Sequence, residues 1–510
     1  MVPKKIIGLL LTALLPLCLS AQEEWEPQRG GCLPSGLPQQ SYVSSSRLLA
    51  PRRLPAINTE WDATKVYKQA VILIEFDEQT DSTSDDTKFS TENPAEYYNR
   101  LFNEKGFSQR HSKGCVADYY REQSGGLLNL SFDVYGPVMV HQKAQPYDEP
   151  NDNTRNYGRA AFVEATNKVI EANPDINWKQ YDWDGDGYVN QVIFVYAGLP
   201  GNVGGVSHGH IWPNTSAFTA ITAPDGTMIS DYSSSGECWP TSSVILCGLG
   251  TICHEFTHSL GLPDLYRTDT GDNVVLDMWD LMDGGNFTNY GFCPPNYTPM
   301  EKILLGWLEP EELTEATTVQ GLEYGKVYKI SNSEDDYYLL ENRVQQGWDE
   351  GVPGKGLCVY HVLWNASRWR KNTVNNGDTK CYDLVHADGL DYYQWLDLLG
   401  GRPAYANKAM MNNMALSTSP FPYLPPDSDA VTSFEEVEGK PVTNIQLNED
   451  GTVSFDFMGG TTAVSLLTSH HSPLTSTYFD LQGRRVSGMV KGQMYIVRQT
   501  DGSIRKYIYR

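Results

Sequence analysis

The segment 253–264 (CHEFTHSLGLPD) brings together residue types that can bind and use a metal ion. His254 and His258 are four residues apart, so their imidazoles leave the same side of a helix, one turn from each other. Gly261 is the residue type that commonly ends a helix in the left-handed conformation. The chain can then turn back, which lets Asp264 offer a carboxylate as a third ligand.

This ligand set predicts a hydrolytic zinc site. Two neutral imidazoles and one carboxylate leave the fourth position of a tetrahedral zinc ion open to water. Zinc lowers the pKa of that water to about 7, and Glu255 is predicted to take its proton. The activated water would attack a peptide carbonyl, so we expect a zinc metalloendopeptidase. The alternative is an exposed helix with two solvated histidines, which gives Gly261 and Asp264 no role at their fixed offsets.

The helix that carries these residues is predicted from an apolar stripe. Its members recur at spacings of three or four residues and are Ile245, Leu249, Ile252, Phe256 and Leu260. The histidines lie on a different side of this helix. Gly248 and Gly250 disfavour its first turn.

A second set of oxygen-bearing residues lies in the segment 182–190 (DWDGDGYVN). They repeat at alternate positions, as in calcium loops, and are Asp182, Asp184, Asp186, Tyr188 and Asn190. An EF-hand would have Glu at its twelfth position, where this chain has Ile193, so we exclude an EF-hand. We predict a structural calcium site, against the alternative of a plain Asp-Gly turn before a strand.

Further segments extend the pattern beyond the histidine motif. They are VADYYREQSGGLLNLS at 116–131, DWDGDGYVNQVIFVYAG at 182–198, HIWP at 210–213, MWDLMDGG at 278–285, PMEKILLGWL at 299–308, and YYLLENR with GWDEGVPGKGLCVYHV further on. With the histidine motif, they resemble the immune inhibitor A metalloproteases, a metzincin-type peptidase family, over about 66–458. The resemblance implies an endopeptidase that acts on extracellular proteins, with Met282 in the turn beneath the zinc ion. It also favours a structural cation at 182–190.

The sequence departs from the family pattern at two positions. Asn214 follows Ile-Trp-Pro where the family often has His, and Cys115 stands where a small hydroxylated residue is expected. Neither is a proposed ligand, so these departures bear on substrate subsites rather than on activity. Metzincins often place a Tyr near the transition state, and Tyr290 and Tyr297 are alternatives for that role.

Other candidate ligands have a simpler explanation. His208 and His210 alternate on a Gly-rich loop, where solvated histidines are commoner than a metal pair, and His210 is a candidate for lining the substrate cleft. Cys32 could ligate zinc as a thiolate and keep the enzyme latent. A disulfide or an unpaired thiol are the alternatives for this cysteine.

The surrounding elements predict an α/β (α+β) catalytic domain at 66–310, which the resemblance implies is metzincin-like, followed by a β-rich domain at 311–458. In the catalytic domain, we expect strands at 69–76, 127–135 and 190–197 and helices at 95–104, 113–123 and 157–172. In the second, short strand-like segments are separated by Gly, Asn and Asp. A linker and a small C-terminal β-hairpin module, which resembles the sorting modules of exported Gram-negative proteins, occupy 459–510.

The N-terminus predicts export. Lys4 and Lys5 precede an apolar run at 6–17, and small residues stand just before the polar 22–24, so we expect a signal peptide at 1–21 and a leader or prosegment at 22–65. The run is shorter than the ~20 residues of a spanning helix. We therefore expect a secreted or cell-surface protein whose mature chain has no transmembrane segment.

The composition of the chain limits the classes of partner that it could bind. A formal net charge of −24 without a basic stretch disfavours nucleic acid, so protein or peptide substrates are expected. The spacing of the nine cysteines fixes no disulfide pairing, and the sequence leaves the oligomeric state open. The competing functions are a non-catalytic extracellular binding or adhesion protein on a protease-like scaffold, and a Ser or Cys hydrolase. The complete set of ligands and base disfavours the first, and the lack of a G-x-S-x-G elbow disfavours the second.

Overall fold

The structure is a computed structural model that describes residues 57–77, 87–141, 158–202, 210–239, 245–270, 275–398, 400, 415–425, 429–461, 477–479, 486, 494–498 and 504–508. The predicted signal peptide, most of the predicted leader, Cys32 and His208 lie outside the described residues.

The first sheet has five strands in the order β2-β1-β3-β5-β4. They are β1 (Val66–Phe76), β2 (Asn129–Val140), β3 (Val192–Tyr196), β4 (Thr215–Thr222) and β5 (Met228–Gly236). β1 pairs in parallel with β2 and β3, and β3 pairs in parallel with β5. β4 is an edge strand and runs antiparallel to β5. The mixed α/β class predicted from the sequence is thereby confirmed.

Helices cover both faces of this sheet. They are α2 (Pro94–Asn103), α3 (Val116–Gln123), α4 (Arg159–Ala172) and α5 (Gly250–Ser259). Val71 and Leu73 of β1 belong to a core shared with α2, α3 and α5, whereas Ile72 and Ile74 belong to a core shared with α4. Because alternate side chains of a strand point to opposite faces, burial on both faces requires the unbroken apolar run of β1.

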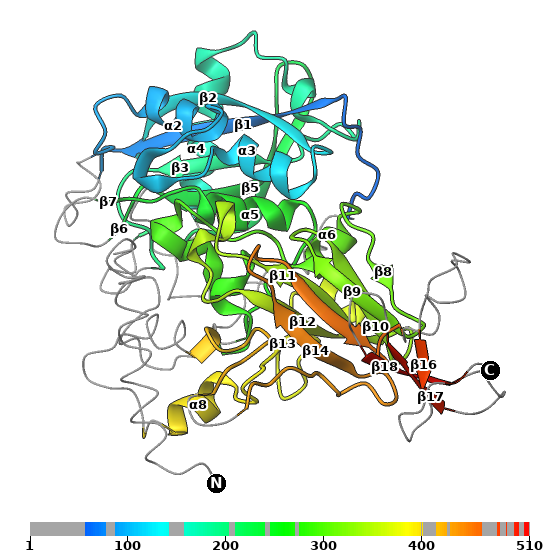
Figure 1. The fold of residues 1–510 in the computed structure, drawn as a ribbon. Coiled ribbons are helices and arrows are strands. Elements are labelled where there is room, and N and C mark those ends of the chain that lie inside the picture. The colour runs from blue at the N-terminus through cyan, green and yellow to red at the C-terminus, as the bar shows by residue number, and fades with distance from the viewer. Residues whose placement is uncertain are drawn as a thin grey trace.

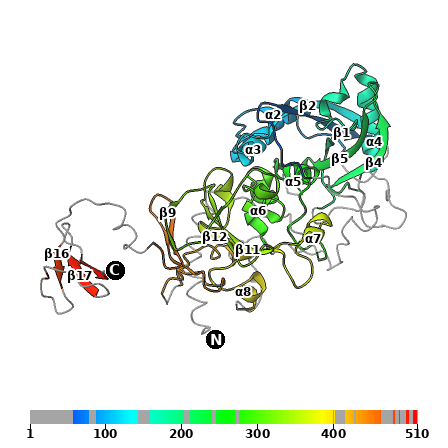
Figure 2. The same ribbon diagram turned by 90° about the vertical axis from the view of Figure 1, so that its right-hand side faces the viewer.

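A second five-stranded sheet has the order β13-β12-β11-β10-β8 and lies beyond α5 (Figures 1 and 2). Its strands are β8 (Glu311–Glu312), β10 (Val327–Ser331), β11 (Asp336–Arg343), β12 (Gly356–Leu363) and β13 (Tyr382–Val385). Leu339 and Tyr360 share the core of α5, so this core continues across residue 310. Leu340 and Val359 share another core with a three-stranded sheet, which consists of β9 (Thr317–Leu322), β14 (Val442–Leu447) and β15 (Val453–Phe457).

A buried arginine connects the second sheet to the loops below α5. Arg343 of β11 is fully buried and forms ion pairs with Glu341 at 3.0 Å and Asp349 at 2.7 Å. Its guanidinium also donates to the carbonyl oxygen of Trp279 at 3.2 Å. A buried guanidinium needs such partners, because an unpaired buried charge is strongly destabilising. The contact between the second sheet and these loops is therefore specified by polar contacts as well as by apolar packing.

The remaining described elements are short. They are β6 (Cys238–Trp239), β7 (Ile245–Leu246), α6 (Pro299–Leu304), α7 (Ala366–Arg370), α8 (Tyr392–Leu398), β16 (Thr477–Phe479), β17 (Met494–Arg498), β18 (Ile504–Ile508) and the 3-10 turns η2 (Gln109–His111), η3 (Trp178–Tyr181), η4 (Asp277–Trp279), η5 (Gly284–Gly291) and η6 (Gly347–Gly351). β16, β17 and β18 form a three-stranded antiparallel sheet, which Figure 2 shows set apart from the others. No helix in the described ranges is long and apolar enough to cross a membrane. The seven cysteines of the described ranges are all buried.

The start of α5 differs from the prediction. The apolar stripe suggested a helix from Ile245, but Ile245 belongs to β7 and the helix begins at Gly250. A Cβ atom at Gly250 would overlap the carbonyl oxygen of Asn286, and one at Gly248 would overlap the backbone at Gly291. Both glycines therefore allow η5 to approach the start of the helix closely, a contact that the local pattern does not reveal.

Candidate metal centre

α5 presents both histidines to the same point, and backbone carbonyls fix their rings. Nδ1 of His254 lies 2.9 Å from the carbonyl oxygen of Leu281, and Nδ1 of His258 lies 2.8 Å from that of Leu262. A carbonyl oxygen can only accept, so each Nδ1 carries the proton that it donates. In the neutral tautomer, each Nε2 therefore has a lone pair available for a metal ion.

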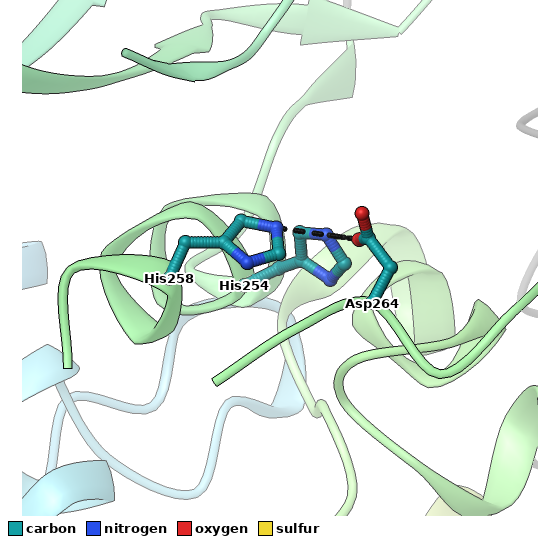
Figure 3. Close-up of side chains that lie close together, drawn as sticks. All are labelled: His254, His258 and Asp264. Carbon is teal, nitrogen blue, oxygen red and sulfur yellow. Dashed lines mark ion pairs between the residues drawn. The ribbon is translucent and has the colours of Figure 1, made fainter. Parts of the chain in front are cut away.

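The chain then returns Asp264 to these nitrogen atoms. Gly261 has φ +100°, a left-handed conformation that suits glycine and ends the helix. Oδ1 of Asp264 lies 3.1 Å from Nε2 of His254 and 3.2 Å from Nε2 of His258 (Figure 3). The three candidate ligand atoms lie within 4.8 Å of one another, and the structure thus brings together the whole predicted set.

The donor set fits a divalent cation. Oδ1 of Asp264 is buried and accepts no hydrogen bond of normal geometry among the described residues. Burial alone would lower the pKa of His254, but the Asp264 carboxylate and the Glu255 charge raise it to about 9. Burial likewise opposes ionisation of Asp264, yet the two imidazoles hold its pKa well below the usual range. The carboxylates of Asp264 and Glu255 thus favour positive charge at this point, which a metal ion would supply.

Glu255 lies beside these ligands and is itself buried. Its Oε2 lies 2.9 Å from the hydroxyl oxygen of Thr215, and that hydroxyl lies 2.6 Å from the Glu255 carbonyl oxygen. Thr215 is the first residue of the edge strand β4, so this strand contacts the candidate base directly. Burial raises the pKa of Glu255, while the two histidines and the Thr215 hydroxyl act in the opposite direction. A carboxylate with a raised pKa is suited to accept a proton near neutral pH.

The predicted Met turn is adjacent to the ligands. Met282 is fully buried, and its backbone N–H donates to Oδ1 of Asp280 at 2.6 Å. Its carbonyl oxygen accepts from the backbone N–H of Leu265 at 2.8 Å, next to Asp264. The preceding Leu281 provides the carbonyl that orients His254. This turn therefore supports two of the three candidate ligands.

Two hydrogen-bond partners of the site were missed by sequence reasoning. They are Thr215, which contacts Glu255, and Asn372, whose Nδ2 donates to Oδ2 of Asp264 at 2.6 Å. Asn372 lies 108 residues along the chain from Asp264. Thr and Asn are common residue types in any sequence, so no local signal identifies either residue.

The other predicted positions have definite surroundings. The hydroxyl of Tyr297 bonds to Thr257 inside the core below α5, and Tyr290 is buried. Asn214 is also buried, and its Oδ1 accepts from the Tyr232 hydroxyl at 2.9 Å. Cys115 caps α3: its Sγ accepts from a backbone N–H at 3.4 Å, the role of a hydroxyl in a capping box. These contacts assign structural roles to the residues that depart from the family pattern.

The acidic loop at 182–190 forms a second cluster. One carboxylate oxygen each of Asp182, Asp184 and Asp186 lie within 4.8 Å of one another. The oxygens of Asp182 accept from the backbone N–H groups of Gly185 at 2.7 Å and Gly187 at 2.9 Å. Tyr188 donates its backbone N–H to Asp186 at 2.8 Å, and Oδ1 of Asn190 accepts from the backbone of Trp183 at 2.5 Å. The loop thus closes on itself, partly exposed to solvent.

Two imidazoles, a carboxylate and an adjacent buried glutamate on an α/β scaffold are the arrangement of a metal-dependent hydrolase. Residues 57–302 match the family model described as "Immune inhibitor A peptidase M6, catalytic domain". The resemblance predicted from the motifs is confirmed: this segment is similar to the catalytic domain of the immune inhibitor A peptidase family.

Curated relatives support the same family. The chain is 29% identical over 217 residues to immune inhibitor A of Bacillus thuringiensis subsp. alesti, covering 36% of this chain and 30% of that protein. It is 24% identical over 253 residues to the pre-pro-metalloprotease PrtV of Vibrio cholerae serotype O1 (strain M66-2), covering 43% of this chain and 28% of that protein. The chain therefore spans less than a third of the length of these relatives.

Proposed function

We propose that the protein is a zinc-dependent endopeptidase that hydrolyses peptide bonds of extracellular proteins. The observation that carries this proposal is the convergence of Nε2 of His254, Nε2 of His258 and Oδ1 of Asp264, with Glu255 beside them. The family of the 57–302 segment supports a metalloprotease. A non-catalytic binding protein would not need a buried glutamate next to three converging ligand atoms.

Each residue has a proposed task. His254, His258 and Asp264 would hold zinc, which polarises the substrate carbonyl and acidifies water when it is bound. Glu255 accepts the proton of the attacking water and returns it to the leaving amine, as general acid–base catalysis requires. Met282 supports the ligands from the turn below them.

Finer parts of the proposal concern the rest of the chain. We propose a structural calcium ion at Asp182, Asp184 and Asp186, with Tyr188 and Asn190 as further ligands. We also propose that the protein is exported through a signal peptide at 1–21. The rest of the chain would consist of a leader at 22–65, a catalytic domain at 66–310, a β-rich domain at 311–458 and a C-terminal module at 459–510. These assignments rest on sequence patterns.

A base substitution tests the proposal. In the purified full chain, Glu255→Gln removes the proton acceptor but none of the ligands. Casein cleavage should fall by about 10²–10⁴-fold, because a general base contributes that much. One zinc per chain should remain by elemental analysis. Glu171→Gln, on the exposed end of α4, is the matched control and should cleave like the wild type.

Removal of the metal completes the test. A zinc chelator should abolish casein cleavage by the wild type, and added zinc should restore it. Unchanged cleavage by the Glu255→Gln variant would refute the proposed mechanism. A natively folded wild-type protein that binds no zinc would refute the proposed metal.

A further inference from the structure

The loop between α7 and β13 forms hydrogen bonds with the segment that carries Asp264. Three asparagines of this loop supply the contacts, and we name them the asparagine clasp: Asn372, Asn375 and Asn376. All three bond to the segment 264–269, although more than 100 residues separate them along the chain. A loop of the region after the family-matched segment therefore touches a candidate metal ligand directly.

Asn372 makes two hydrogen bonds to Asp264 itself. Its Oδ1 accepts from the backbone N–H of Asp264 at 2.6 Å, and its Nδ2 donates to the carboxylate Oδ2 at 2.6 Å. The second bond occupies Oδ2 and leaves Oδ1 directed at the two imidazoles. Asn372 has φ +56°, in the left-handed region that asparagine tolerates better than most residues.

The other two asparagines hold the backbone that follows. Nδ2 of Asn375 donates to the carbonyl oxygen of Leu265 at 2.7 Å, and Oδ1 of Asn376 accepts from the backbone N–H of Thr268 at 2.8 Å. Oδ1 of Asn375 in turn accepts from the backbone of Tyr382 at 3.0 Å. Since Tyr382 begins β13, the clasp is anchored to the second sheet.

The chemistry of an amide suits the orientation of a metal ligand. A lysine or arginine at this position would pair with the Asp264 carboxylate and cancel part of the charge that attracts the metal. The amide of Asn372 fixes the carboxylate while leaving its charge intact. Such partners of metal ligands typically contribute 10–100-fold to metal affinity.

We propose that Asn372 is a positioning residue for the metal centre, and that the clasp makes the second sheet a required part of tight metal binding. This inference rests on the proposed zinc site. It adds that the ligands of the 57–302 segment reach their full affinity only with a loop from outside that segment.

The test measures zinc affinity in the full chain by competition with a chromophoric chelator. Asn372→Gly removes both side-chain hydrogen bonds, and glycine adopts a positive φ without steric cost. Asn444→Gly is the matched control, because Asn444 has φ +54° and donates to the carboxylate of Asp456 at 2.8 Å in an exposed part of β14. Asn376→Ala removes clasp bonds that do not reach the ligand.

We expect Asn372→Gly to raise the zinc dissociation constant by about 10–100-fold. Asn444→Gly should stay within about twofold of the wild type, and Asn376→Ala should have an intermediate effect. A dissociation constant for Asn372→Gly within twofold of the wild type would overturn the inference. An equal loss of zinc affinity in Asn376→Ala and Asn372→Gly would also overturn the inference. The loop would then only stabilise the 264–269 segment, without a specific effect of Asn372 on the ligand.

Hydrogen exchange in the wild type gives a second readout that holds even if Asn372→Gly fails to fold. Coupling is reciprocal, so zinc binding must stabilise the clasp as much as the clasp stabilises zinc binding. Zinc should slow amide exchange at 371–377, where Gly377 donates to Asp269 at 3.0 Å, and leave 444–452 unchanged. Equal exchange at 371–377 with and without zinc would contradict the inference. A wild-type protein that binds no zinc would instead remove the proposed function.

Discussion

His254 and His258 of α5 and the nearby Asp264 are buried or largely buried, whereas Asp182, Asp184 and Asp186 lie in a turn that is partly open to solvent. The sequence suggested a metal for both clusters. In the first, two of the three ligands are oriented by atoms from distant segments: His254 by the Leu281 carbonyl and Asp264 by the Asn372 amide. In the second, the carboxylates accept hydrogen bonds from backbone N–H groups of the same turn.

This difference bears on what a cation would add. Oδ1 of Asp264 is buried and faces Nε2 of His254 at 3.1 Å and Nε2 of His258 at 3.2 Å, atoms that carry lone pairs in the neutral tautomer. A cation would satisfy all three atoms at once. The oxygens of Asp182 already accept two backbone N–H groups in a partly solvated turn. The first cluster should therefore bind its metal tightly, and the second should bind weakly and affect stability more than chemistry.

The largest expected effect comes from removing one ligand from each cluster. His258→Ala should lose zinc and lower casein cleavage on the order of 10³-fold, because the charge stabilisation by a metal is worth several kcal/mol. Asp184→Ala should keep the full zinc content. Elemental analysis and a casein assay on the two variants check this. Zinc loss from Asp184→Ala, or its retention by His258→Ala, would erase the distinction between the clusters.

Glycines at the two clusters offer the next largest effect. A Cβ at Gly250 would lie 1.9 Å from the Asn286 carbonyl oxygen, so alanine there must displace α5 from η5 and should cost about 3 kcal/mol, the upper end for overpacking. Gly187 has φ +90° with open space around it, so alanine there costs only the roughly 1–2 kcal/mol of left-handed backbone strain. Thermal unfolding of the metal-free proteins should give the lower Tm for Gly250→Ala. The reverse order would show that close packing does not set the position of the zinc helix.

Thr215 provides a smaller and more specific test of the buried site. Thr215→Val keeps the shape of the side chain but removes the hydroxyl that contacts Glu255 at 2.9 Å. Loss of a hydrogen bond to a charged group costs about 1.5–3 kcal/mol, and the lower end corresponds to about tenfold in kcat/KM. Thr215→Ser retains the hydroxyl and should recover activity to within about twofold, with zinc content unchanged in both. Equal activity of the Val and Ser variants would show that the hydroxyl does not act on the base.

Features that depend on neighbouring residues could be predicted from the sequence. The one-turn spacing of His254 and His258, the glycine that ends α5 and the apolar run of β1 each follow from helix or strand geometry alone. The same holds for the acidic turn at 182–190, whose contacts are local. The predictions of these features are correct because no distant segment is needed to produce them.

Features that depend on tertiary contacts could not be predicted. The contact of Thr215 with Glu255 joins residues 40 positions apart, and that of Asn372 with Asp264 joins residues 108 positions apart. The helix start at Gly250 depends on the approach of η5, which follows it in the chain. In each case, the decisive partner lies on an element whose position is set by core packing. A single sequence carries no periodic signal for such a pairing.

The smallest expected effect concerns calcium at the acidic turn. If the turn binds calcium with a dissociation constant of 10⁻⁴–10⁻³ M, as extracellular calcium modules do, then calcium at about 1 mM stabilises the folded state by roughly 0.4–1.4 kcal/mol. For a chain of this size, the Tm should rise by a few degrees at most. Asp182→Asn keeps the side-chain shape, lowers the charge of the turn and should abolish this rise, without changing zinc content. Magnesium at the same concentration is the control, because its strict octahedral geometry fits a turn of this kind poorly. An equal rise with magnesium, or a full rise with calcium in Asp182→Asn, would mean that the cation acts elsewhere, and the turn would then be a self-contained backbone structure that needs no metal.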